Sequence, residues 1–299
     1  MQNPHLELTV RVGCHVVYAT STPTAILLTL RIRDDIYQKV RRQKLIFTPH
    51  LSTASFVDAH GNLTDRAVLQ PGENIVHHDA LVSVPSLPDN PVPPGLPSPV
   101  YELPPETLRY TLPSRYIDSD KLFNFAWLQF GHIENGVQRV QAICDWTHNN
   151  IQYRFGAGRS DISASEVLIQ RFGVCRDFAH VAIALCRCFN IPARYVTGHL
   201  PDIAYQDPGT PMDFHAYFEV FLGQHWSTYD ARFNIPRIGR IKIAQGLDAV
   251  DGAFSTIYGQ AELKWFEVWA YQVNPSHVTL GDPIDLSKRL DGTTTLRRK

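Results

Sequence analysis

The chain has 299 residues, of which 44% are hydrophobic, and its 28 basic residues nearly balance its 29 acidic residues. This length predicts about two domains, each able to bury an apolar core. The near-zero net charge argues against a nucleic-acid partner. No apolar stretch long enough to span a membrane occurs, and the N-terminus lacks the build of a signal peptide, so we expect a cytoplasmic protein with no membrane partner.

The first 100 residues are predicted to form an all-β, sandwich-like domain. Apolar and polar residues alternate over residues 6–12, a second strand is expected over residues 25–33, and residues 59–63 are typical of a hairpin tip. The short basic run at residues 39–44 is interpreted as a solvated turn. It does not indicate a nucleic-acid surface.

Proline marks the predicted boundary between two domains. Ten of the 21 prolines fall between Pro85 and Pro113. Proline-rich sequence is extended and semi-rigid, so residues 101–115 are predicted to be a linker. An α+β domain is expected over residues 116–275, followed by a polar C-terminal tail over residues 276–299.

A helix is predicted to begin near Cys175, because apolar residues recur at helical spacing from Phe178 to Phe189. Gly173 is interpreted as the left-handed residue that ends the preceding helix, which starts at a capping box over residues 163–166. The N–H groups and the positive dipole end of a helix start stabilise a thiolate. Cys175 is therefore a candidate nucleophile, and the same N–H groups could hold an oxyanion.

A base and an orienting group are predicted downstream, on a β-hairpin. Aromatic and β-branched residues at 214–222 and 225–230 flank the turn residues Gly223 and Gln224. If the turn is centred between Leu222 and Gly223, facing residues have numbers that add to 445, as His215 and Asp230 do. Directly opposed side chains are close enough for a carboxylate to hydrogen-bond an imidazole.

The order of cysteine, histidine and aspartate resembles the transglutaminase-like family within the papain-like thiol enzymes. The motifs that carry the resemblance are Gly173-Val174-Cys175-Arg176-Asp177-Phe178-Ala179-His180, Gly198 after Ile191-Pro192-Ala193-Arg194-Tyr195-Val196, His215-Ala216-Tyr217-Phe218-Glu219-Val220 and Asp230. Residues 244–252 and 263–273 look like the C-terminal portion of bacterial members, which carry an N-terminal β domain. The resemblance implies a papain-like α+β core with the cysteine on a helix and the other two residues on an antiparallel sheet.

By this resemblance Cys175 is the nucleophile, His215 the general base and acid, and Asp230 the residue that orients the histidine. The chain departs from the family where many relatives read Asp-Pro-Thr-Asn, because residues 230–234 read Asp-Ala-Arg-Phe-Asn. The expected chemistry is attack on a protein or peptide amide to form a thioester. An amine then gives transamidation and water gives deamidation or peptide hydrolysis, and both outcomes stay open.

Two other function classes are kept beside the enzyme. The first is a catalytically silent binding or scaffold protein on the same fold, and the second is peptide or carbohydrate recognition by the N-terminal β domain. We expect no cofactor and no metal, since Cys186 and Cys188 project in different directions on one helix. Asp177 and His180 are interpreted as structural, and Trp226, Trp265 and Trp269 as core residues more readily than cleft residues. The oligomeric state is left open.

Overall fold

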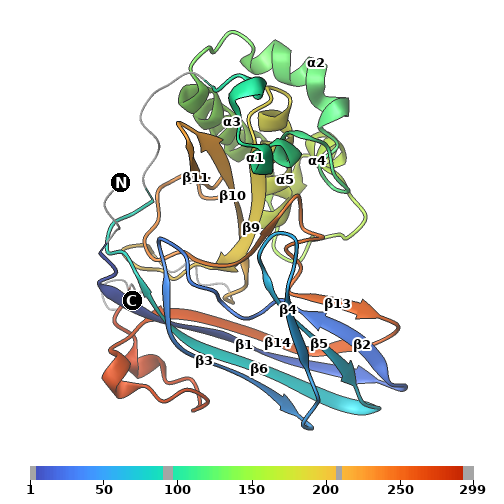
Figure 1. The fold of residues 1–299 in the computed structure, drawn as a ribbon, viewed down its shortest axis with the longest axis vertical. Coiled ribbons are helices and arrows are strands. Elements are labelled where there is room, and N and C mark those ends of the chain that lie inside the picture. Colours follow the sequence, from blue (N-terminus) through green and yellow to red (C-terminus); the bar gives the residue numbers. More distant parts are fainter. Residues whose placement is uncertain (1–4, 90–96, 207–210, 292–299) are drawn as a thin grey trace.

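The computed structural model describes residues 5–89, 97–206 and 211–291. A β-sandwich lies below an α+β core in Figure 1. The strands of the β-sandwich are β1 (Leu8–Thr20), β2 (Thr24–Leu28), β3 (Lys39–Thr48), β4 (Ala54–Val57), β5 (Leu63–Leu69), β6 (Gly72–Val84), β13 (Ser255–Tyr258) and β14 (Glu262–Gln272). The core contains α2 (Ser119–Phe130), α3 (Gly136–Asn150), β7 (Gln152–Tyr153), α4 (Ala164–Gln170), β8 (Phe172–Gly173), α5 (Cys175–Arg187), β9 (Ala193–His199), β10 (His215–Leu222), β11 (His225–Tyr229) and β12 (Ile241–Gly246).

The sandwich consists of two antiparallel four-stranded sheets, with strand orders β14-β1-β6-β3 and β13-β2-β5-β4. Inward residues of β1, such as Cys14 and Val16, have no exposed surface and pack against Ile26 and Leu28 of β2. Alternate β-branched residues suit a strand whose one face is buried. The predicted sandwich-like N-terminal domain is confirmed.

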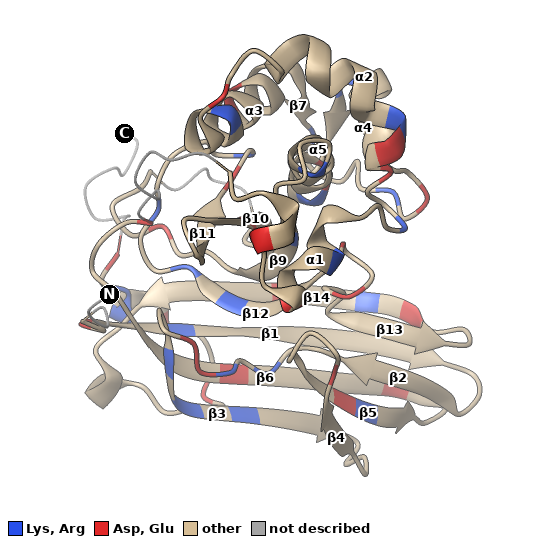
Figure 2. Ribbon diagram, turned by 45° about the horizontal axis from the view of Figure 1, so that its top comes forward, with Lys and Arg blue, Asp and Glu red and all other residues tan. Residues whose placement is uncertain are grey.

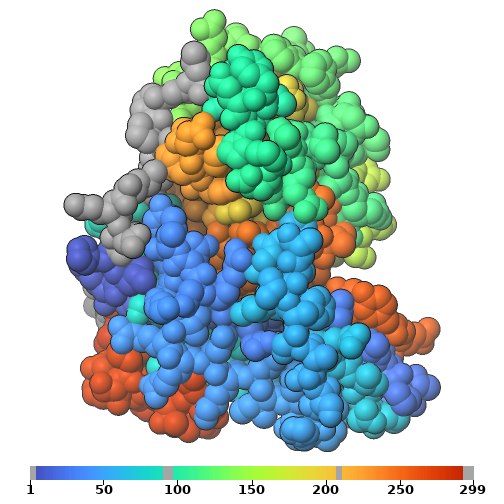
Figure 3. Space-filling view, in the orientation of Figure 1, coloured from blue at the N-terminus to red at the C-terminus, as the bar shows by residue number. Residues whose placement is uncertain are grey.

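The two C-terminal strands belong to the sandwich, whereas the sequence-based boundaries grouped them with the α+β domain. β14 pairs with β1 from Val10↔Gln272 to Ala19↔Glu262, and β13 pairs with β2. In Figure 3 this orange-red part of the chain lies against the blue N-terminal strands. Residue periodicity identifies a strand but does not reveal which distant strand it will pair with.

The basic run at residues 39–44 is the start of edge strand β3, so its interpretation as a turn was wrong. Figure 2 shows the Lys and Arg residues of this strand in blue along the rim of the sheet. Charged side chains on an edge strand hinder pairing with another chain, which gives the run a structural role.

The predicted linker is folded along part of its length. It contains the short helical turns η1 (Val100–Glu102), α1 (Pro105–Leu108) and η2 (Arg109–Thr111), and it buries Leu103, Thr107 and Tyr110. Proline favours the first position of a helix, where its missing N–H costs nothing, and Pro105 occupies that position. A proline-rich stretch was therefore compatible with short helices as well as with an extended chain.

The predicted C-terminal tail is also partly packed. Residues 275–291 include the turns η3 (Pro275–His277) and η4 (Leu286–Lys288). Val278 and Leu280 join a buried cluster with Leu81, Trp269 and Tyr271 on the outer face of the first sheet. Residues 292–299, interpreted from sequence as mobile, lie outside the described residues.

Helix α5 forms the centre of the α+β core. It packs on β9 and β10 and is surrounded by α2, α3 and α4. Its side chains are buried on every face, including Phe178, Val181 and Leu185. Its buried polar residues Asp177, His180 and Arg187 have hydrogen-bond partners, so the helix can lie innermost. Among the described helices, none is long and apolar enough to cross a membrane.

The core rests on an extension of the first sheet. Ile241 and Ile243 of β12 pack on Val10 and Val12 of β1 in a buried apolar cluster. The far half of the same sheet face packs on the second sheet of the sandwich. One long sheet therefore supports both parts of the molecule and fixes their relative position.

A buried carboxylate joins three strands of the core sheet, whose order is β11-β10-β9-β12. Glu219 on β10 contacts Arg194 on β9 at 2.6 Å and Lys242 on β12 at 2.7 Å. Burial alone would raise the pKa of Glu219, but the two cations outweigh burial and lower it to about 2.

We expect Glu219→Gln to lower the free energy of unfolding at neutral pH by about 3 kcal/mol, because two buried cations lose their partner. The folded pKa lies below the unfolded value of 4.5. The contribution is therefore complete above the unfolded pKa and is lost as the pH falls towards the folded one. Denaturant unfolding across the acid range measures this, with the exposed Glu73→Gln as control. Equal losses in the two variants would contradict it.

Candidate active site

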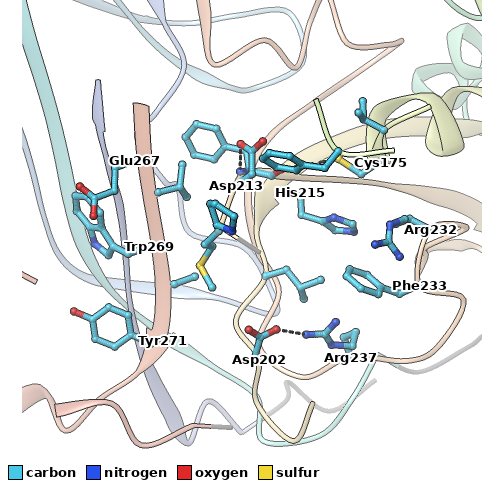
Figure 4. Close-up of a pocket in the computed structure, with 18 of the residues that line it drawn as sticks. Cys175, Asp202, Asp213, His215, Arg232, Phe233, Arg237, Glu267, Trp269 and Tyr271 are labelled. Carbon is cyan, nitrogen blue, oxygen red and sulfur yellow. Dashed lines mark hydrogen bonds and ion pairs between the residues drawn. The ribbon is translucent and has the colours of Figure 1, made fainter. Parts of the chain in front are cut away.

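Cys175 is the first residue of α5, as the sequence predicted. It is the one partly exposed cysteine of the five, and all five are free thiols. Its Sγ lies 4.0 Å from the Phe214 carbonyl oxygen, one residue before His215. Figure 4 shows the thiol at the wall of a cavity, with the His215 ring beside it. The start of α5 thus presents a thiol to open space.

Asp177 holds the start of α5 in place. Its Oδ2 accepts a hydrogen bond from the Val174 N–H at 2.9 Å, and its Oδ1 pairs with Arg176 at 2.8 Å. A Cβ on Gly173 would lie 2.6 Å from the Asp177 Cβ, so glycine is needed for close approach. The left-handed residue that ends α4 is Arg171, with φ 63°, and the role predicted for Gly173 was wrong.

The capping box that starts α4 is confirmed. The Ser163 N–H donates to Glu166 Oε2 at 2.6 Å, and in return the Ser163 side chain accepts a hydrogen bond from the Glu166 N–H. Helix α4 then delivers the chain to the turn before Cys175. Here a purely local signal gave the correct structure, since both partners lie within one helical turn.

The hairpin of β10 and β11 forms with a register different from the predicted one. Leu222 pairs with His225 across Gly223 and Gln224, whose φ angles are 57° and 69°, so facing residue numbers add to 447. Both φ angles are positive, as a two-residue type I′ turn requires. The predicted sum of 445 was wrong, because the turn lies one residue later.

The corrected register still brings His215 and Asp230 together. A change of two in the sum keeps each side chain on its face of the sheet and makes the two residues diagonal neighbours. His215 Nε2 and Asp230 Oδ2 are 2.7 Å apart. The contact was predicted correctly, although the direct opposition from which it was deduced does not exist.

Asp230 is a buried carboxylate held by four groups. Its Oδ1 accepts from the N–H groups of Arg232 and Phe233 at 3.0 and 3.2 Å. Its Oδ2 contacts His215 Nε2 at 2.7 Å and Arg240 Nη1 at 2.9 Å. Burial would raise the pKa of Asp230, but the charges of His215 and Arg240 together with these hydrogen bonds hold it well below its usual range.

The imidazole of His215 lies between Asp230 and Cys175. Burial lowers the pKa of His215, but the Asp230 charge and hydrogen bonds with Asp230 and Cys175 outweigh burial and raise it. Because Asp230 engages Nε2, Nδ1 is the nitrogen left for the thiol. The ring is packed against Phe233 and Tyr217, at centroid distances of 5.2 and 6.4 Å.

A cavity of about 820 Å³ opens in front of Cys175 and His215. Its walls come from both parts of the molecule, and they include Tyr153, Val174, Asp213, Arg232, Phe233, Glu267, Trp269 and Tyr271. Trp269, interpreted as a core residue, is 5% exposed and also lines the cavity. Trp226 instead lies under Arg194, and Trp265 is exposed on the sheet surface. The cleft is thus shared between the core and strand β14.

Charged side chains surround the cavity. The Arg232 guanidinium lies 3.8 Å from the centre of the Tyr153 ring, and Arg237 pairs with Asp202 at 3.1 Å, as Figure 4 shows for the ion pair. Burial raises the pKa of Asp213, which lies two residues before His215. The departure at residues 230–234 therefore places an arginine and a phenylalanine at the cleft, where the family pattern has smaller residues.

The residues interpreted as structural occupy structural positions. The His180 ring is fully buried, stacks on Tyr116 and accepts a hydrogen bond from the Ala249 N–H at 3.2 Å. Burial holds the pKa of His180 well below its ordinary value. Cys186 and Cys188 are buried, and no three metal-ligating side chains converge within the described residues.

Sequence reasoning missed several groups around the triad. Tyr153 lies on β7, and nothing in the surrounding sequence marked it as a cleft residue. Arg240 had no local signal, because its partners Asp89 and Asp230 are distant in the sequence. The cleft residues of β14 could not be found while that strand was assigned to the wrong neighbours.

The comparisons with known proteins agree with this geometry. Residues 129–231 match the model of the transglutaminase-like superfamily. A solved structure from Cytophaga hutchinsonii, described as a candidate cysteine protease, is 31% identical with a TM-score of 0.78 and covers 89% of this chain and 91% of that one. The chain belongs to the transglutaminase-like superfamily. The resemblance drawn from the motifs is therefore confirmed.

Two curated relatives match over shorter stretches of the transglutaminase-like chain. An uncharacterized protein of Mycobacterium leprae is 30% identical over 117 residues, which are 38% of this chain and 42% of that protein. An uncharacterized protein of Mycobacterium tuberculosis is 36% identical over 64 residues, 21% of this chain and 20% of that protein. The match therefore spans less than half the length of either relative.

The balance of forces on His215 leads to a prediction for Asp230→Asn. The pKa of His215 is raised above 6.5 in the wild type, and it should fall below 6.5 in the variant because burial is no longer outweighed. An NMR titration of the imidazole signals measures both values. His180 serves as an internal control, since it should stay neutral in both proteins. A His215 titration that the substitution leaves unchanged would contradict the assignment.

Proposed function

We propose that this protein cleaves an amide bond through a thioester on Cys175, with His215 as acid and base and Asp230 as its orienting residue. The observation that carries the proposal is the 2.7 Å contact between His215 and Asp230 beside a partly exposed thiol at a cavity of about 820 Å³. Pockets of this size accept ligands as large as a short peptide. The substrate we propose is a peptide or protein amide.

The reaction begins with transfer of the Cys175 proton to His215. The sulfur attacks the amide carbonyl carbon, the C–N bond breaks, and the imidazolium returns its proton to the leaving amine or ammonia. Water then loses a proton to His215 and attacks the thioester, which releases a carboxylic acid and restores the thiol. Asp230 stays ionised throughout and keeps the imidazole in one orientation.

The oxyanion formed by this attack would lie at the start of α5. Cys175 occupies the first helical position, where the backbone N–H has no intrahelical acceptor. Such N–H groups and the positive end of the helix dipole stabilise negative charge. The nucleophile and the donor for the oxyanion are therefore one residue, which fixes their relative position.

Hydrolysis is the outcome that we favour. Asp213 and Arg232 line the cavity beside Cys175, and we expect such charged walls to admit water to the thioester. The similar protein from Cytophaga hutchinsonii is described as a candidate cysteine protease, which points in the same direction. Transfer to an amine is the second candidate. It is supported by the Asp213 carboxylate beside His215, for which the described residues provide no ion pair.

Two observations bear on the non-enzymatic alternatives. A silent scaffold would not need the Asp230 carboxylate to remain buried and charged next to His215. A separate binding function of the β-sandwich is less favoured, because Val268 and Ala270 on the inward face of β14 line the same cavity as Cys175. The enzyme proposal uses both features.

Alkylation with iodoacetamide tests the activated thiol without knowledge of the substrate. We expect Cys175 to be labelled below neutral pH, well before the other four cysteines, because burial raises the pKa of each of those thiols. The His215→Ala variant should lose the advantage of Cys175, while the exposed His132→Ala keeps it. Mass spectrometry of each cysteine over a pH series gives the rates. Labelling of Cys175 no faster than that of the other cysteines would contradict the proposal.

Turnover is tested with mixed peptides, by detecting new amino termini and released ammonia with and without an added primary amine. We expect product in the wild type and a loss of at least about a thousandfold in Cys175→Ala, since Cys175 is the one thiol among the described residues that line the cavity. Circular dichroism should show that the variant is folded. New termini indicate hydrolysis and amine incorporation indicates transfer. Equal turnover in the two proteins would exclude a Cys175 thioester.

A further inference from the structure

Arg240 lies behind the triad, in the segment between β11 and β12. The residue is 9% exposed, and its guanidinium contacts two carboxylates. Nη1 lies 2.9 Å from Asp230 Oδ2, and Nε lies 2.6 Å from Asp89 Oδ2. The guanidinium is also 4.9 Å from the centre of the Tyr217 ring. It is held on several sides, which fixes its charge close to the triad.

Asp89 is distant from Arg240 in the sequence and follows a few residues after β6. Its N–H donates to the Arg237 carbonyl at 2.9 Å, and its Oδ2 accepts from the Arg237 N–H at 3.2 Å. Asp89 is therefore fixed by the backbone of the segment that carries Arg240. The result is a row of alternating charges that runs from Asp89 through Arg240, Asp230 and His215 to Cys175.

We propose that Arg240 is a positioning residue that orients Asp230 and opposes protonation of the Cys175–His215 pair, and that Asp89 sets the strength of this effect. The proposal rests on the function proposed above. Arg240 and His215 contact the same oxygen, Asp230 Oδ2, and therefore compete for its charge. A nearby positive charge favours the thiolate and disfavours the imidazolium. Asp89 partly cancels that charge.

The chemistry of arginine suits this position. Its planar guanidinium offers several N–H groups at fixed angles, so that one side chain can meet two carboxylates from different segments. A lysine has a single ammonium group, which would contact one of the two carboxylates closely but not both. Titratable and charged groups face His215 from every element packed against it, namely Cys175 (α5), Tyr153 (β7), Asp213 (before β10), Tyr217 (β10), Asp230, Arg232 and Arg240 (after β11).

The alkylation rate of Cys175 against pH tests the proposal in the full chain. Arg240→Gln removes a positive charge, so its profile should move to higher pH by about one unit. Asp89→Asn removes the charge that cancels Arg240, so its profile should move to lower pH by about a few tenths of a unit. Arg240→Lys keeps the charge and should retain a profile near that of the wild type. Shifts of opposite sign are not expected from a merely structural contact.

Arg31→Gln is the matched control, because it breaks a comparable ion pair with Asp65 within the β-sandwich and should leave the profile unchanged. Thermal unfolding identifies variants that do not fold. If Arg240→Gln fails to fold, a downward shift in Asp89→Asn supports the proposal and an unshifted profile overturns it.

The two proposals fail in different ways. No selective labelling of Cys175 in the wild type would contradict the proposed function itself. Selective labelling in the wild type, with both variants unshifted or shifted in the same direction, would leave the function standing. It would show that Arg240 is only structural and overturn the inference.

Discussion

The buried charge of Asp230 is the constraint on which the site depends. A carboxylate removed from water must be compensated, and here the compensation comes from backbone N–H groups, from His215 and from Arg240. These groups lie on β10 and on the segment after β11. The hairpin must therefore form with its imidazole and its carboxylate on one face, and the following segment must turn back to present Arg240. The conformation of the chain near the cleft therefore provides the partners that the Asp230 carboxylate needs.

The β-sandwich takes part in the same arrangement. Asp89 extends from the end of the N-terminal strands to neutralise Arg240, and β14 supplies one wall of the cavity. Apolar contacts between β12 and β1 hold the two parts together. The sandwich therefore acts as more than a separate binding module, because its position determines both the cleft and the charges behind the triad.

Structural features formed by residues that are close in the sequence could be predicted from the sequence alone. The Ser163 capping box, the start of α5 at Cys175 and the hairpin around Gly223 are of this kind. The predicted hairpin register was wrong, because the turn is formed by Gly223 and Gln224 and lies one residue later than expected. The His215–Asp230 contact survived since a shift of two residues preserves the face. Arg240, Asp89 and the pairing of β14 depend on long-range contacts that no local pattern encodes.

The involvement of both chain ends has a consequence for how the site is assembled. β14 pairs with β1 across most of the chain length, and β13 joins the second sheet in the same way. Pairing between such distant segments carries a high loop-closure cost and is slow to form compared with local contacts. The helix that carries Cys175 and the hairpin that carries His215 are local, whereas the wall with Trp269 requires the last strand. The residues of the triad can therefore meet before the cleft that would select a substrate is complete, so the chemistry and the selection of a substrate depend on different stages of folding.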